Sequence, residues 1–159
     1  MYINNMVKII KYALLIYFFT FSQAQADRLV PLKDWIFKNE NYLKDKVTQS
    51  YLINRCSAAY LLVAGLTQTN SDGILSKQFA DISQDLMIVN ANILMSLKGW
   101  GQKDALQNIQ DNVKRMGDAY YADAKDNYAK TGEYTSVGYI RDDLILCKKT
   151  TEIFLKQYK

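Results

Sequence analysis

Residues 47–63 (VTQSYLINRCSAAYLLV) and residues 140–158 (IRDDLILCKKTTEIFLKQY) decide the fold of this chain. In each segment the apolar residues recur at steps of three and four, so they share one face of an α-helix. The first stripe consists of Val47, Tyr51, Leu52, Cys56, Ala59, Tyr60 and Val63. The second consists of Ile140, Leu144, Cys147, Thr151, Phe154, Leu155 and Tyr158. Each stripe contains one cysteine, so both sulfur atoms are predicted to point into the same core.

The rest of the chain also has helical periodicity. Two further long helices are predicted at about 74–98 and 102–130, and a short helix is predicted to open near Pro31 and Asp34. The stripe of the 102–130 segment is thin and consists of Ala105, Ile109, Val113, Met116, Tyr120, Ala124 and Tyr128. We therefore expect that helix to lie on the bundle with most of its surface in water. The sequence therefore predicts an all-α, four-helix-bundle-like single domain with a short N-terminal helix.

The first 26 residues have the pattern of a secretory signal peptide. Lys8 and Lys11 precede an apolar run at 12–21, and Ala24-Gln25-Ala26 matches the Ala-x-Ala cleavage pattern. A helix that spans a bilayer needs about 20 apolar residues, and this run is much shorter. We expect cleavage after Ala26, a mature domain at 27–159 in the periplasm or outside the cell, and no stable membrane anchor afterwards. A retained anchor is the alternative.

Two cysteines in an exported chain of this size predict a disulfide. The bond between Cys56 and Cys147 would join the first and last long helices across 91 residues of chain (147 − 56). Two buried free thiols are the alternative. No CxxC pattern occurs, so a thioredoxin-like redox role has no support.

Composition excludes several classes of function. The chain has no histidine, which excludes His-based triads, His–zinc sites and His-ligated haem. The net charge is +4, and without the two signal lysines it is 18 − 16 = +2, which is unlike the basic footprint of a nucleic-acid-binding protein. Asp118 and Asp123 lie about 140° apart around one helix axis, and the adjacent Asp142 and Asp143 lie about 100° apart. Asp126, on the same helix as Asp118 and Asp123, is expected to form an ion pair with Lys130. We therefore predict no catalytic constellation, no metal site and no cofactor.

Tyrosine is enriched between residues 120 and 139, at Tyr120, Tyr121, Tyr128, Tyr134 and Tyr139. Tyrosine is common at interface hot spots, because its ring is large and rigid and its hydroxyl bonds polar groups. These residues are therefore a candidate interaction surface. The alternative is that they border a small core with their hydroxyls in water. Tyr120 and Tyr121 cannot both face the core, so we expect at least one to be exposed.

Two arginines lie close to the cysteines in sequence. Arg55 precedes Cys56, and Arg141 lies six residues before Cys147. We expect them to flank the disulfide and to form ion pairs with Asp142 or Asp143. The alternative is an anion site for a ligand carboxylate, which suits the planar guanidinium group.

The layout, an exported helical domain with cysteines in its first and last long helices, is similar to that of some periplasmic immunity proteins against secreted toxins. With no catalytic constellation, it favours a non-enzymatic protein-interaction module of the inhibitor or immunity type. Its partner would be a periplasmic or secreted protein bound at residues 120–139. The alternative is a carrier that holds a small apolar ligand between the helices.

Overall fold

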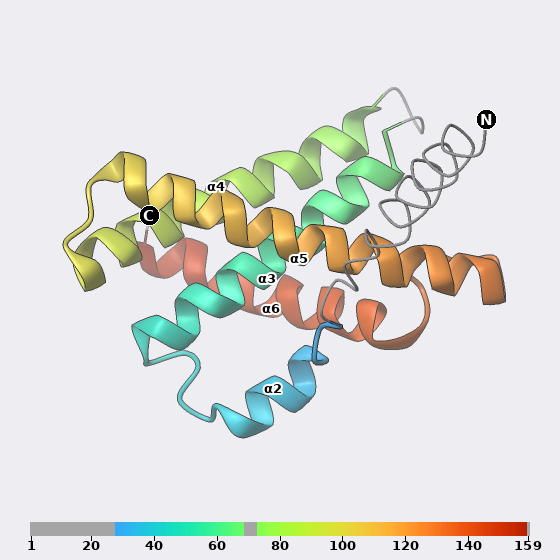
Figure 1. Cartoon of the computed structure of the whole chain (residues 1–159), viewed down its shortest axis with the longest axis horizontal. Helices are drawn as coiled ribbons and strands as arrows, with labels where there is room; N and C mark the ends of the chain where they lie inside the picture. The colour runs from blue at the N-terminus through green and yellow to red at the C-terminus, as the bar shows by residue number, and fades with distance from the viewer. Residues whose placement is uncertain (1–27, 69–72, 159) are drawn as a thin grey trace, which may run out of the picture.

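The computed structural model describes residues 28–68 and 73–158, which form five helices and no strand (Figure 1). The predicted signal peptide at 1–26 lies outside the described residues. The helices are α2 (Leu32–Lys38), α3 (Lys46–Leu66), α4 (Ile74–Lys98), α5 (Gln102–Thr131) and α6 (Gly138–Tyr158). The all-α prediction is confirmed.

Local signals explain where the long helices begin and end. Asp45 precedes α3, and its side chain accepts a hydrogen bond from the backbone N–H of Thr48 at 2.8 Å, as an N-cap residue does. Gly99 ends α4 with φ +65°, and its N–H donates to the carbonyl of Met95. This left-handed conformation favours glycine, which is why the predicted end of the helix is correct.

The four long helices alternate in direction. In Figure 1, α3 and α5 run one way along the molecule, and α4 and α6 run the other way. All four long helices contact one another, and α3, which makes the most extensive contacts, is the central helix. It is buried at 13 of its 21 positions, so burial extends well beyond the single predicted stripe. Val47, which the stripe placed in the core, is instead 56% exposed in the first turn of α3.

The stripe predicted for α5 forms its buried face. Six of its seven members are buried: Ala105, Ile109, Val113, Met116, Tyr120 and Ala124. The seventh, Tyr128, is half exposed. Ala119 is the other buried residue of this 30-residue helix, so most of its surface faces water, as expected.

The disulfide between Cys56 and Cys147 is present and joins α3 to α6. Both cysteines are buried in the core. The bond holds the central helix against the last helix, which the chain reaches only after the whole of α4 and α5. The predicted cross-link between the first and last long helices is thus confirmed.

Reduction of this disulfide is expected to lower the free energy of unfolding. A cross-link that closes a 91-residue loop restricts the unfolded chain, and the loop-entropy model gives about 4.6 kcal/mol as an upper value. We expect a loss of about 2–4 kcal/mol. Urea unfolding followed by circular dichroism, with and without a reductant, measures it. Equal midpoints in the two conditions would contradict the expectation.

Candidate interaction surface

Arg55 lies at the centre of a buried polar network. Its guanidinium is completely buried, and Nη2 donates to Oδ2 of Asp143 at 2.5 Å. Nε donates to the hydroxyl of Tyr120 at 3.1 Å. Nη1 donates to the carbonyl of Val30 and to the hydroxyl of Tyr51. All three guanidinium nitrogens therefore have acceptors within the protein.

Asp143 completes the network from α6. Its Oδ2 also accepts a hydrogen bond from the Tyr120 hydroxyl at 2.6 Å, and its Oδ1 accepts one from the backbone N–H of Leu32 at 2.8 Å. One carboxylate therefore connects α3, α5, α6 and the start of α2. Burial raises the pKa of Asp143, and the hydrogen bond from Tyr120 and the positive charge of Arg55 oppose that shift.

The two arginines singled out in the sequence have different surroundings. Arg55 is enclosed and paired with Asp143, whereas Arg141 is exposed and pairs with its neighbour Asp142 at 3.2 Å. They share no partner. A ligand-carboxylate site that uses both arginines therefore has no support in the geometry, because the donors of Arg55 are already engaged.

Asp143→Asn is expected to destabilise the fold by about 3–5 kcal/mol, because it leaves the buried charge of Arg55 without a counter-charge. Asp142→Asn is the matched control. It removes the neighbouring, more exposed carboxylate and should cost about 0.5 kcal/mol or less. Thermal and urea unfolding of both variants measure the difference. A similar loss of free energy of unfolding in the two variants would show that the buried Arg55–Asp143 pair does not stabilise the fold.

The five candidate tyrosines differ in burial: Tyr120 is buried, Tyr134 and Tyr139 are half-buried, and Tyr121 and Tyr128 are exposed. Tyr120 is fully buried in the network, and Tyr139 stacks on it at 6.0 Å and donates to Asp123 at 2.5 Å. Tyr121 is 53% exposed and Tyr128 is 50% exposed. The expected exposure of at least one of the adjacent pair Tyr120 and Tyr121 is confirmed.

The enclosed tyrosines make the fold sensitive to alkali. Burial raises the pKa of Tyr60, Tyr120 and Tyr139 above the ordinary value of about 10. The folded protein thus keeps these phenols neutral at a pH where the unfolded chain ionises them. The contribution of these phenols to the free energy of unfolding is fully present below pH 10, and it is lost as the pH rises above that value. We expect a late rise in tyrosinate absorbance that coincides with loss of helical circular dichroism. Ionisation of all tyrosines before unfolding would contradict this.

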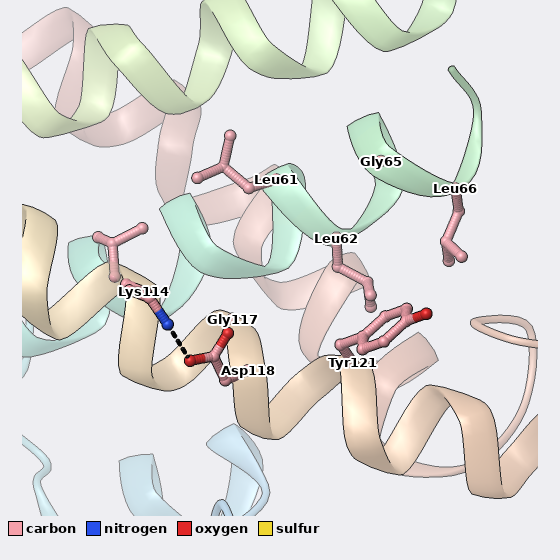
Figure 2. Close-up of a pocket in the computed structure, with 9 residues that line it drawn as sticks. Leu61, Leu62, Gly65, Leu66, Lys114, Gly117, Asp118 and Tyr121 are labelled. Carbon is pink, nitrogen blue, oxygen red and sulfur yellow. Dashed lines mark hydrogen bonds and ion pairs between the residues drawn. The ribbon is translucent and has the colours of Figure 1, made fainter. Parts of the chain in front are cut away.

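An apolar groove of about 420 Å³ lies between α3 and α5. We call it the glycine groove; it is lined by Leu61, Leu62, Gly65 and Leu66 of α3 and by Val113, Lys114, Gly117, Asp118 and Tyr121 of α5. In Figure 2, Leu62 and Leu66 point from α3 toward the Tyr121 ring on α5. Lys114 and Asp118 pair with each other at 2.5 Å across one turn of α5. The groove therefore has little net charge and suits apolar or aromatic groups.

Two glycines keep the groove open. Neither Gly65 nor Gly117 has a positive φ, and a Cβ built at either position would meet no atom within 4 Å. Neither packing nor backbone conformation within the chain therefore requires glycine there. Glycine inside a helix is less stable than alanine by about 1 kcal/mol. The observed effect of the two glycines is to leave space between the helices.

The exposed tyrosines continue the groove along α5. Tyr121 and Tyr128 are seven residues apart, which places them on one face of the helix. The ammonium of Lys125 lies over the Tyr121 ring at 5.7 Å, and Tyr134 stacks on Tyr128 at 4.3 Å. We call these four residues the tyrosine ridge. Together the groove and the ridge form an aromatic and aliphatic surface with polar edges.

Sequence reasoning identified the tyrosines but missed the groove. Gly65 lies one residue before the end of α3 at Leu66, where a glycine in the sequence indicates the end of a helix. Gly117 is an isolated glycine inside a long helical pattern, and such a glycine often has a packing or functional reason. That glycine was the signal available in the sequence.

Within the described residues, there is neither a metal-binding cluster nor a candidate membrane span. Within 28–68 and 73–158, no group of three or more cysteine or carboxylate side chains is placed to bind a metal ion. In the same ranges, no helix has the length and apolar character that crossing a bilayer requires. No protein-family model matches the chain, and searches for a similar curated protein and for a similar solved structure found no match either.

Proposed function

We propose that this chain is an exported, non-enzymatic protein-interaction module of the inhibitor or immunity type. Its binding surface is the glycine groove together with the tyrosine ridge. The observation that carries the proposal is that Tyr121 belongs to both, so that an open apolar groove leads directly into a row of exposed tyrosines. A partner side chain would enter the groove, and the ridge would cover the surrounding contact.

The composition of this surface fits protein recognition. Interface hot spots are enriched in tyrosine and centred on pockets that exclude water, with a polar rim around them. Lys114 and Asp118 neutralise each other at the edge of the groove, so a partner need not supply a compensating charge. The space beside Gly65 and Gly117 allows a partner side chain to approach the helix backbones closely.

The proposal places the protein in an oxidising compartment outside the cytoplasm. Disulfides persist in oxidising compartments, and Cys56–Cys147 is compatible with such an environment. With the basic and apolar pattern of the first 26 residues, this supports export to the periplasm or the medium. The partner is then a periplasmic or secreted protein.

The partner is to be captured with the full chain produced in an oxidising compartment and identified by mass spectrometry. Its affinity is then measured against variants of the surface. Tyr121→Ala and Tyr128→Ala are each expected to weaken binding by about tenfold, the effect of losing a hot-spot side chain. Phe37→Ala is the matched control, because Phe37 is 82% exposed but lies on α2, away from the groove.

Gly117→Leu separates binding from folding. Leucine has a higher helix propensity than glycine, so the free energy of unfolding should stay level or rise by about 0.8 kcal/mol. Its side chain would fill the glycine groove, and binding should fall by at least the tenfold expected of the tyrosine variants. Arg115→Leu adds the same side chain at an exposed position of α5 outside the groove. Unchanged affinity in Gly117→Leu and in both tyrosine variants would reject this surface.

A further inference from the structure

A second and larger groove lies on another side of α3, between α4 and α6. It has a volume of about 510 Å³. Its apolar lining comes from three helices: Tyr60 and Val63 of α3, Phe79 and Ile82 of α4, and Leu144 and Ile145 of α6. None of these residues lines the glycine groove. The two grooves are therefore separate, and this one takes no part in the proposed protein contact.

The floor of this groove is held in place before any ligand arrives. Tyr60 is buried, stacks on Phe79 at 5.8 Å, and its hydroxyl lies 3.3 Å from Oγ1 of Thr151. The disulfide is close on both sides, since Cys56 lies one turn before Tyr60 and Cys147 lies three residues after Leu144. A groove that is already formed loses little conformational entropy when it binds.

The apolar lining is incompletely covered. Ile145 is 53% exposed at the edge of the groove. Leu75, one turn before Phe79 on the same face of α4, is 41% exposed. Leu75 does not itself line the groove. Exposed apolar groups beside a groove mark binding sites on soluble proteins. An apolar chain laid along the groove would remove them from water.

The charged side chains that line the groove have one sign. Arg141 and Lys148 both line it, and they lie seven residues apart on one face of α6. No acidic side chain lines the groove. Lys148 has no ion pair within 28–68 and 73–158, whereas Arg141 pairs with Asp142, which lies outside the lining. Glu152, one turn after Lys148, acts electrostatically on Tyr60 but does not line the groove. The lining itself therefore carries two cations, and two carboxylates lie close outside it.

We infer that this groove binds a single-chain amphiphile with one carboxylate, a free fatty acid. Its hydrocarbon chain lies over Tyr60, Val63 and Phe79, and its carboxylate lies between Arg141 and Lys148. The guanidinium of Arg141 offers paired donors that match a carboxylate, and Lys148 adds a point charge. The carboxylates of Asp142 and Glu152 close to the two cations favour a singly charged carboxylate over a phosphate that carries close to two charges.

The test uses the full chain with its disulfide intact and dodecanoate as the probe, followed by methyl NMR of the isoleucines. Saturable shifts are expected at Ile82 and Ile145, below the concentration at which the probe forms micelles. Ile88 and Ile153, which are exposed but do not line the groove, should not shift. Shifts at all four residues, or no saturable shift at Ile82 and Ile145, would overturn the inference.

Variants and matched probes test the head group. Arg141→Gln with Lys148→Gln is expected to weaken dodecanoate binding by about tenfold, and Lys149→Gln, one residue beyond Lys148 and outside the groove, should leave it unchanged. Methyl dodecanoate, which has no charge, should bind as weakly to the wild-type chain as dodecanoate binds to the double variant. Equal affinity for the acid and the ester would reject the carboxylate site. Shifts with vesicles of anionic lipid but not with free dodecanoate would show a membrane surface instead.

Discussion

The guanidinium of Arg55 is completely buried, and a charge in that position is stable only with a counter-charge beside it. Asp143 supplies the counter-charge from α6, and Tyr120 of α5 bonds to both. Leu32 at the start of α2 donates its N–H to the same carboxylate. The orientation of four helices thus depends on one ion pair. Cys56, the residue after Arg55, forms the disulfide with Cys147, which joins α3 to α6 covalently.

This arrangement explains why the surface has two different grooves. Because α3 is central, α4, α5 and α6 must all pack around it, and they leave its C-terminal half partly uncovered on two sides. On the side of α5, the uncovered part is bordered by Gly65, Gly117 and the Lys114–Asp118 ion pair, which has no net charge. Toward α4 and α6 it is bordered by apolar side chains and two cations. The first suits a protein side chain, and the second suits a chain with an anionic end.

Helical periodicity predicted most of the fold. The segment 74–98 is helical over the expected range, because Gly73 and Gly99 stand at its two ends in the left-handed conformation. The prediction was poorer for α3, where Ser50, Asn54 and Ser57 are buried beside the apolar stripe. Asn90 of α4 donates to Asn54 and to the carbonyl of Ser50, and Ser83 donates to that of Ser57. The Ser57 hydroxyl itself is buried without a partner among the described residues. Buried polar residues resemble solvent-exposed residues in a sequence, so periodicity alone does not reveal them.

By itself, the sequence determined the helices, their apolar faces and the pairing of Cys56 with Cys147, since these follow from local periodicity and from the number of cysteines. It also showed that Tyr120 and Tyr121 must face different ways. Only the tertiary structure decided that Tyr120 bonds Arg55 and Asp143 while Tyr121 borders a groove. The reason is physical: the direction of a side chain from its own helix is local, but what it meets depends on where the neighbouring helices cross.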